Sequence, residues 1–530
     1  MRYVRGNILA SAGTQNAKQR QLERHRTNLF MVEISKRLVK VAKTAMILNG
    51  DGHSGMTAGD SLGPYTKFDS TILARANRHS PTVILTNPPF AGVGDGRVSN
   101  DDVLRRFETG RKWTDKDGDY RRTGEPPSEG VPPELLFFER CVDWLAPGGR
   151  LGIVMPKSFL DTQTYRPGRE LLFRHCRLRA VINCHKNTFQ PHTGVRTCLV
   201  VVEKLKEGEN LPEDYPIFMA ISRKVGQDSE GVPIYRRDAT NNITEQIDED
   251  LTEIAAAYSA FLCGKLVSTG YVFQVWKSEL DAHRRINPQL FLPHLNETLA
   301  AVASLDGTAG WSVTTLDDLA SDVKVFKGPR FKSETIIVEE RKEGVEPYYT
   351  PSAVLQEKSD SVKLLDVSRA SPRQRGVIEA IRVRRGDIVI TRSGSIGRVA
   401  YITRRFDGAI VSDDLIRVRI ADEGRRLYLL AYLQTKFAQD QILRNEYGAI
   451  QQHLEPEHVR NLLVPVPDNA STFDGIVDAA RQSVDAREQL EALQEATLTQ
   501  LQDVIATAVS ERAVQTDAAS LAMTPQVAAQ

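Results

Sequence analysis

A five-residue segment has the residue types that methyl transfer to a planar amino group requires. It reads Thr-Asn-Pro-Pro-Phe and follows the apolar run at residues 83–85. The lone pair of an exocyclic amino group is delocalised into its ring, so an enzyme that methylates this group must aim acceptors at both amino hydrogens. The amide oxygen of Asn87 and the carbonyl of Pro88 can accept them. Pro88 and Pro89 stiffen the loop, and Phe90 offers a face on which a base extruded from a duplex can stack.

Two acidic residues upstream stand where nucleotide-binding folds place ligands for a cofactor. Glu33 ends the apolar run 29–34, where such folds hold a pair of ribose hydroxyls through a bidentate carboxylate. Asp60 and Ser61 lie in a Gly-Asp-Ser-Leu segment at a second strand-to-loop edge, which suits the purine of a cofactor. The order of these segments before Asn87 predicts a single site.

The elements that must position these residues follow an α/β pattern. Apolar runs alternate with helical spacing from residue 28 to about 204, which is typical of a mostly parallel, doubly wound sheet with crossover helices. The predicted strands are 29–34, 83–85, 151–155, 180–182 and 198–202, and the predicted helices are 36–48 and 134–145. In such sheets ligands bind at the carboxyl ends of the strands.

The composition and the hydrophobic pattern change in the rest of the chain. Residues 205–270 are mixed and acidic, which favours a connector or a solvated helix. Residues 310–467 contain short β-branched runs separated by turns, which predict a small β-rich domain with a few helices. Residues 472–509 place apolar residues at helical or heptad spacing and predict one long helix or a helical pair. The tail after residue 513 is small and polar and is expected to be disordered.

Composition limits the class of protein. The 530 residues allow about three to four domains, and 41% hydrophobic with 26% charged residues is typical of a folded protein. A net charge of +1 means that a polyanion would need a local basic patch. The five cysteines contain no C-x-x-C pair, which argues against disulfides and zinc and for a reducing cytoplasm. No apolar run predicts a membrane span, and the polar start does not resemble a signal peptide. We therefore expect a cytoplasmic protein without membrane or metal.

Residues 28 to about 290 resemble the catalytic domain of S-adenosylmethionine-dependent N6-adenine DNA methyltransferases, specifically the modification subunit of type I restriction systems. The resemblance rests on Gly-Asp-Ser-Leu at 59–62, Asn-Pro-Pro-Phe at 87–90, the run 137–156 with its Pro-Gly-Gly-Arg turn, and Phe189, Gly194, Val195, Thr197 and Lys204. It implies that Glu33, Asp60 and Ser61 bind S-adenosylmethionine and that the loop beginning at Asn87 acts on adenine in double-stranded DNA.

The front of the chain departs from that family. The family's glycine-rich loop lies against the methionine part of the cofactor and should precede the strand that ends at Glu33. Only residues 1–27 are available there, and the segment 10–14 is at best a degenerate remnant of the loop. The sequence therefore predicts weak cofactor binding by this chain alone. A partner, such as a methylase fragment encoded upstream, would then have to supply the loop.

Residues 310–509 resemble one half of the specificity subunit of the same systems, a target recognition domain followed by a spacer helix. Trp311, the strand and turn 385–394, the segment 447–454 and residues 463–467 carry this resemblance. Independently, residues 365–405 hold ten arginines against three acidic residues, a density suited to phosphate contacts. The predicted DNA-binding residues are Arg369, Arg373, Arg375, Arg392, Ser393 and Arg398. Side chains of 324–375 and 391–395 are expected to reach base edges.

The sequence thus predicts an α/β, Rossmann-like methyltransferase domain, incomplete at its front, followed by a small α+β target recognition domain and a long carboxyl-terminal helix. The predicted segments are the front 1–27, the catalytic core 28–205, a connector 206–309, the recognition domain 310–468, the helix 469–512 and the tail 513–530. Partners would be DNA, a restriction or specificity subunit, and a second copy bound through helix 472–509.

Three functions remain open from the sequence. The first is a DNA adenine methyltransferase of a restriction-modification system, with recognition on the same chain. The second is a recognition subunit that is catalytically impaired until a partner supplies the cofactor loop. The third is a methyltransferase of protein amides or RNA amino groups, since Asn-Pro-Pro serves that chemistry too.

Overall fold

The computed structural model describes residues 2–49, 55–90, 96–116, 119–265, 268–308, 310–331, 333–340, 342–356, 362–444 and 454–522. The chain forms two compact units, Met1–His294 and most of the chain from Leu295 onward. The sequence pattern places the second domain from residue 310. The structural boundary lies before residue 310 because helix α9 (Pro293–Ala303) contacts the second unit. The Thr298 hydroxyl of this helix donates to Asp440 at 2.8 Å.

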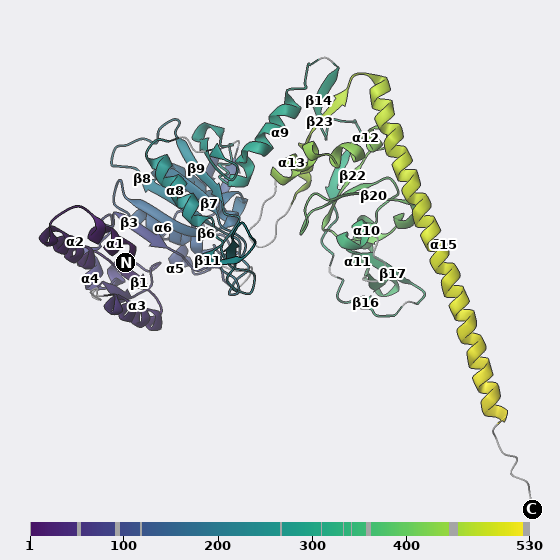
Figure 1. Ribbon diagram of the computed structural model, residues 1–530, viewed down its shortest axis with the longest axis horizontal. Helices are drawn as coiled ribbons and strands as arrows, with labels where there is room; N and C mark the ends of the chain where they lie inside the picture. Colours follow the sequence, from purple (N-terminus) through teal and green to yellow (C-terminus); the bar gives the residue numbers. More distant parts are fainter. Residues whose placement is uncertain are drawn as a thin grey trace, which may run out of the picture. The chain divides into compact units, whose positions relative to one another are not determined.

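A seven-stranded sheet forms the centre of the first unit, with the order β12-β13-β9-β7-β8-β6-β3 (Figure 1). Its strands are β3 (Val83–Thr86), β6 (Arg150–Pro156), β7 (Cys176–Asn183), β8 (Thr197–Lys204), β9 (Pro216–Ile221), β12 (Ser268–Thr269) and β13 (Val272–Trp276). Each predicted strand from residue 83 to 202 lies in this sheet. The segment read as a connector also contributes to it, through β9, β12 and β13.

The prediction of a mostly parallel sheet is wrong. The pairs β3–β6 and β7–β9 are parallel, but β8 runs antiparallel to both β6 and β7, and β13 antiparallel to β9. Two parallel neighbours need a crossover connection, usually a helix. Residues 184–196, which connect β7 to β8, contain turns and no helix, so β8 returns antiparallel beside β7.

Eight helices of the described chain lie in this unit, and the larger ones enclose its core. They are α1 (Arg2–Ala10), α2 (Gln15–Thr27), α3 (Lys36–Leu48), α4 (Ser70–Arg75), α5 (Asp101–Leu104), α6 (Pro133–Trp144), α7 (Arg166–His175) and α8 (Leu251–Leu262). Phe138 of α6 is fully buried, and Ile254 and Phe261 of α8 pack against Ala180 and Phe218 of the sheet. The remaining strands form two-stranded sheets: β1 (Met31–Glu33) with β2 (Met56–Ala58), β4 (Trp113–Lys116) with β5 (Asp119–Arg122), and β10 (Tyr235–Arg237) with β11 (Ile243–Ile247).

The front of the first unit leaves apolar side chains uncovered. Within the described residues β3 is the last strand of its sheet, and Val83 and Leu85 are 53% and 81% exposed. On α3, Leu38, Val41 and Leu48 follow one another at helical spacing and are all exposed. An amphipathic helix and an edge strand of this kind normally bury such residues against another element.

The second unit is built from two four-stranded sheets, β15-β22-β19-β20 and β16-β18-β17-β21, and the pair β14–β23. Its strands are β14 (Trp311–Thr315), β15 (Lys324–Lys327), β16 (Ile337–Val338), β17 (Val345–Tyr349), β18 (Lys363–Asp366), β19 (Ile388–Thr391), β20 (Val399–Tyr401), β21 (Ile410–Val411), β22 (Leu415–Arg419) and β23 (Leu463–Pro467). Its shorter helices are α10 (Pro351–Gln356), α11 (Pro372–Ile381), α12 (Glu423–Leu433), α13 (Lys436–Arg444) and α14 (Pro456–Arg460). This arrangement agrees with the predicted small α+β domain.

One helix, α15 (Ala470–Ala522), forms the carboxyl-terminal part of the described chain. Val477 packs into the core of the second unit and Glu491 accepts a hydrogen bond from Thr403 at 2.6 Å. Figure 1 shows α15 in yellow continuing past the rest of that unit. The helix extends into the predicted disordered tail because residues 513–522 are rich in alanine and the next proline is Pro525.

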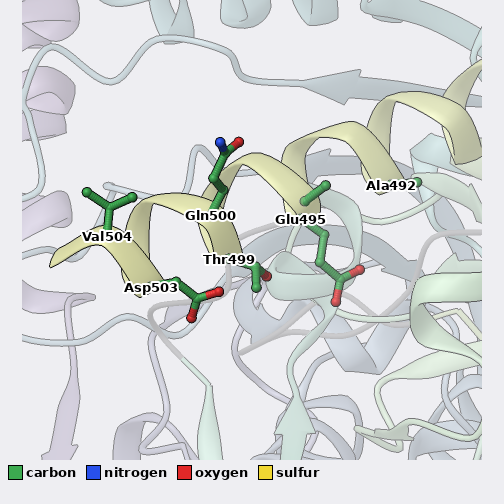
Figure 2. A pocket seen from close by; sticks show the side chains of 7 residues that line it. Ala492, Glu495, Thr499, Gln500, Asp503 and Val504 are labelled. Atoms are coloured by element: carbon green, nitrogen blue, oxygen red, sulfur yellow. The ribbon is translucent and has the colours of Figure 1, made fainter. Parts of the chain in front are cut away.

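From residue 492 to residue 510 the side chains of α15 lie on the surface. Leu493, Leu498 and Leu501 are each more than half exposed. Figure 2 shows Glu495, Thr499 and Asp503 along one side of the helix, around a shallow hollow lined by α15 residues alone. Because no second element contributes a side chain, this hollow is not built as a binding site.

Candidate functional site

The Asn-Pro-Pro-Phe loop begins at the carboxyl end of β3. The Asn87 side chain is exposed, and no hydrogen bond of the described residues uses its amide. Pro88 is buried and Phe90 is half-buried, so the loop is anchored on both sides of an exposed Pro89. The loop therefore presents a free amide oxygen on a stiff backbone, which is the geometry that acceptance from a substrate amino group requires.

The two predicted acidic ligands are brought together by strand pairing. β1 and β2 are parallel, with Glu33 opposite Ala58, and the Gly59 amide donates to the Glu33 carbonyl at 3.0 Å. Asp60 and Ser61 therefore follow β2 at the same edge at which Glu33 ends β1. Parallel pairing aligns the carboxyl ends of these two strands. The predicted single sheet is not observed, however, because β1 and β2 form a two-stranded sheet separate from the one that contains β3.

Both carboxylates already accept a local backbone hydrogen bond. Glu33 Oε1 accepts from the Ser35 amide at 2.8 Å, and Ser35 is the N-cap residue of α3. Asp60 Oδ1 accepts from the Leu62 amide at 2.9 Å. Each carboxylate keeps a second oxygen, and these bonds restrict the orientation of the side chain.

The donor set fits one half of S-adenosylmethionine. Glu33, Asp60 and Ser61 offer oxygens suited to the ribose and purine. Within the described residues no glycine-rich loop follows a strand next to β3, and the segment 10–14 links α1 to α2 instead of following a strand. The methionine part of the cofactor therefore has no matching partner among these residues.

The arginines of the 365–405 stretch divide into two groups. Acidic residues distant in sequence pair with four of them: Glu346 with Arg382, Glu455 with Arg392, and Glu488 with Arg385 and Arg404. Burial alone would raise the pKa of Glu488, but hydrogen bonds from Arg385 and the Arg404 amide lower it below the ordinary value. The local count of ten arginines thus overstates the free positive charge.

Some of the predicted DNA-binding residues belong to the paired group of side chains and others do not. The side chains of Arg369, Arg373 and Arg398 are exposed and make no ion pair with the residues that the structure describes, whereas Arg392 is 2.7 Å from Glu455. Arg375 donates to the carbonyls of Ala370 and Ser368, and Ser393 donates to Asp414 at 3.0 Å. The segment 447–454, which contributed to the resemblance, lies outside the described residues except for Leu454.

The sequence analysis did not identify one cluster of basic residues. Arginines from four separate segments of the first unit meet around one hollow. No local spacing marks them, and only the count of arginine in residues 97–140 could have drawn attention to the region. The described residues contain no group of three or more side chains suited to a metal ion. Within the same residues no helix has the length and apolarity that crossing a bilayer demands.

The two units correspond to two known domain families. Residues 6–261 match the family model described as N-6 DNA Methylase, and residues 308–499 match the Type I restriction modification DNA specificity domain. The first unit is therefore similar to a DNA methylase domain and the second unit to a DNA specificity domain. The Asn-Pro-Pro-Phe loop, Glu33 and Asp60 all lie in the first match.

One relative matches part of the chain. The chain is 23% identical over 256 residues to "Type II restriction enzyme and methyltransferase RM.BcgI" of Heyndrickxia coagulans, covering 47% of this chain and 34% of that protein. The chain thus spans about a third of that relative's length.

Solved structures resemble the chain more distantly. The type IIG restriction endonuclease BpuSI has a TM-score of 0.33 at 14% identity, with 81% of this chain and 52% of that chain covered. The type I restriction-modification methyltransferase subunit from Streptococcus thermophilus has a TM-score of 0.33 at 16% identity, with 49% and 47% covered.

Proposed function

We propose that the chain is the methylating and site-recognising part of an N6-adenine DNA methyltransferase of a restriction-modification system. The observation that carries the proposal is the exposed amide of Asn87 at the end of β3, which makes no hydrogen bond within the described residues and lies in a region that matches the N-6 DNA methylase family. The specificity domain on the same chain favours DNA over a protein amide or an RNA amino group as the substrate.

The residues of the loop have different roles in the proposed reaction. S-adenosylmethionine, when bound, supplies an electrophilic methyl group. The Asn87 amide oxygen and the Pro88 carbonyl accept hydrogen bonds from the adenine amino group. These two bonds direct the lone pair of the amino nitrogen away from the ring. Phe90 stacks on the extruded base, and the two prolines keep the acceptors in place without reorganisation.

Substitution of Asn87 tests this role. Asn87→Ala should lower the rate of DNA methylation by at least about 100-fold, because one of two acceptors at the amino group is lost. DNA binding should stay within a few fold, since the amide does not position the duplex. The assay is transfer of labelled methyl groups to DNA by the complete enzyme. Asn77→Ala, another exposed asparagine of the same unit, is the control. Methylation at a near wild-type rate by Asn87→Ala would contradict the proposal.

DNA recognition is assigned to the second unit. The exposed, unpaired Arg369, Arg373 and Arg398 contact phosphates, while Arg375, Arg392 and Ser393, which are held by hydrogen bonds, shape the adjoining turns toward the bases. Because each phosphate contact releases a counterion, Arg373→Ala with Arg398→Ala should flatten the salt dependence of DNA binding by about one to two slope units. Fluorescence anisotropy at several salt concentrations measures this slope. Arg425→Ala, an exposed arginine outside the stretch, should leave it unchanged.

A second candidate function follows from the uncovered front of the first unit. The exposed Val83 and Leu85 and the incomplete donor set favour a chain that binds S-adenosylmethionine only with a partner. Isothermal calorimetry on the chain alone should give little heat with the cofactor. Co-expression with a fragment that carries an apolar strand and a glycine-rich loop should restore binding. Tight binding by the chain alone would contradict this second function and leave the first standing.

Partners follow from the same parts. Double-stranded DNA is the substrate, a restriction or specificity subunit completes the system, and the exposed leucines of α15 serve a second copy of the chain. Glu33, Asp60 and Ser61 hold the adenosine half of the cofactor.

A further inference from the structure

A basic hollow of about 850 Å³ lies in the first unit, away from the Asn-Pro-Pro-Phe loop. It includes His79, which precedes β3, and Lys204, which ends β8. Val83 pairs with Arg150, and Arg150 pairs with Glu203, so this is the end of the sheet at which β3 begins. Asn87 follows the opposite end of β3, roughly 13 Å further along the strand. The hollow is therefore separate from the proposed methyl-transfer site.

Seven arginine or lysine side chains line the hollow, against three carboxylates. All three carboxylates are engaged. Asp143 accepts from Arg78 Nε at 2.9 Å and from the Tyr65 hydroxyl, and Glu108 pairs with Arg174 at 2.7 Å. Glu139 accepts from the amides of Glu108 and Thr109 and from the Thr109 hydroxyl, at 2.7 to 2.8 Å. None of them is available to a further cation.

Within the described residues, four of the seven cations have no carboxylate partner. The Arg106 side chain is exposed and makes no hydrogen bond or ion pair with these residues. The Arg111 guanidinium donates to the carbonyls of Gly124 and Arg105. Lys204 Nζ donates to the carbonyls of Leu145 and Asp143 at 2.8 and 3.2 Å and is 3.3 Å from His79 Nδ1.

Arg140 is the most informative of the four. Its side chain is 6% exposed, its Nη2 donates to the Gly63 carbonyl at 2.9 Å, and its Nε is buried without a partner. The rings of Tyr65 and Phe107 lie 4.4 and 5.0 Å from the guanidinium carbon and hold it in place. A buried arginine normally faces an anion, because an uncompensated charge in low dielectric is costly. Within the described residues no carboxylate pairs with this guanidinium.

Burial shifts the pKa of three groups around the hollow. It lowers the pKa of Lys204 below its ordinary value. Burial also lowers the pKa of His175, and the charges of Arg174 and Lys204 lower it further. Burial raises the pKa of Glu139. A bound anion would oppose the first two of these shifts, because it favours the charged forms of Lys204 and His175.

We propose that this hollow binds a phosphate-bearing ligand, held by Arg106, Arg111, Arg140 and Lys204. Guanidinium groups offer paired donors that match phosphate oxygens, and an ammonium adds a point charge. The volume exceeds that of one phosphate, so the ligand carries several phosphates or a nucleoside. Free nucleotides or polyphosphates and the backbone of a nucleic acid share this chemistry. The site lies outside both predicted DNA-contacting regions and does not depend on methylation.

Calorimetry with inorganic pyrophosphate and anisotropy with a labelled 20-base-pair duplex test the proposal on the full chain. Arg106→Glu should weaken binding of at least one of these probes by about tenfold or more, because a phosphate contact becomes a repulsion. Arg106 is exposed and unbonded, so the variant should keep its thermal unfolding midpoint. Arg37→Glu, on the exposed surface of α3, makes the same charge change elsewhere in the unit.

The pattern of losses identifies the source of the phosphate. Loss of pyrophosphate binding assigns the hollow to a free phosphate compound, and loss of duplex binding alone assigns it to a nucleic acid backbone. Arg140→Lys, which keeps the charge but loses the fork, should weaken the same probe. If Arg106→Glu binds both probes like the wild type, or if Arg37→Glu weakens them equally, the proposal is wrong. Methylation assays do not enter the test, so it stands apart from the proposed function.

Discussion

Two strands of nearly the same sequence have opposite environments in this molecule. β3 reads Val-Ile-Leu-Thr and β19 reads Ile-Val-Ile-Thr, and each is followed by a loop that bears candidate functional residues. In β19 all three apolar side chains are fully buried, between β22 and β20. In β3 Val83 is 53% and Leu85 is 81% exposed, because a neighbour lies on one side only. Burial is thus a property of neighbouring strands and not of the strand's own residues.

The difference bears on function. The second unit has a closed core, so its turns are held by packing on several sides. The front of the first unit offers an edge strand and an apolar helix face, and among the described residues 87–90 only Pro88 and Phe90 are buried or half-buried. An edge with unpaired backbone groups and exposed leucine is suited to accept a further strand. The edge that the proposed partner strand would cover is therefore in the first unit.

The largest expected effect is on the closed strand. Ile390→Ala should lower the free energy of unfolding by about 3 kcal/mol, because it leaves a cavity in the core of the second unit. Chemical denaturation of the full chain measures it, with the transition assigned to the second unit by hydrogen exchange. A loss below about 1 kcal/mol would remove the contrast between the two strands.

The stability of the first unit should depend on pH through the buried carboxyl of Asp161. Burial raises the pKa of Asp161 to about 6, while Lys157 and the Asn287 amide partly offset this. A carboxyl with a raised pKa binds protons more tightly when folded. Its contribution therefore makes the folded state less stable as pH rises from about 4 to about 6, by on the order of 1 kcal/mol per pH unit.

Asp161→Asn should flatten this dependence, because the amide does not titrate. Denaturation curves of the two proteins between pH 4 and pH 7 measure the difference in slope. Parallel curves would mean that Asp161 is solvated, and the closed core of the first unit would then end before residue 161.

The smallest expected effect is on the edge strand. Leu85→Ala should change the free energy of unfolding of the chain alone by less than about 0.5 kcal/mol, because most of this side chain already contacts solvent. Leu85→Asp should be equally mild in the chain alone, yet it should block completion by a partner strand. Denaturation and co-purification with the strand-and-loop fragment measure the two effects. A large loss of stability in the chain alone would show that β3 is covered.

The sequence predicted the local elements well, and for local reasons. The helix 36–48 coincides with α3, and the run 83–85 lies within β3. Periodicity and turn residues determine such elements without reference to distant parts of the chain. The antiparallel direction of β8 was missed because it depends on the absence of a helix between β7 and β8, and apolar runs carry no sign of direction.

Charge shows the same limit. The ten arginines at 365–405 can be counted in the sequence, but four pair with Glu346, Glu455 and Glu488, which long-range folding brings to them. The basic hollow shows the opposite case. Arginines from separate segments converge there, and the carboxylates beside them already accept other hydrogen bonds. Neither result has a signature in local spacing.

By itself the sequence determined which residues could do chemistry, since Asn87, Glu33 and Asp60 are defined by type and by position at strand ends. Only the tertiary structure decided which of them share an edge, which arginines keep their charge, and which apolar strand is left uncovered. The physical reason is that propensity and periodicity act over a few residues. Burial and electrostatic pairing depend instead on groups that are far apart in the chain, such as Arg385 and Glu488, and are brought together by folding.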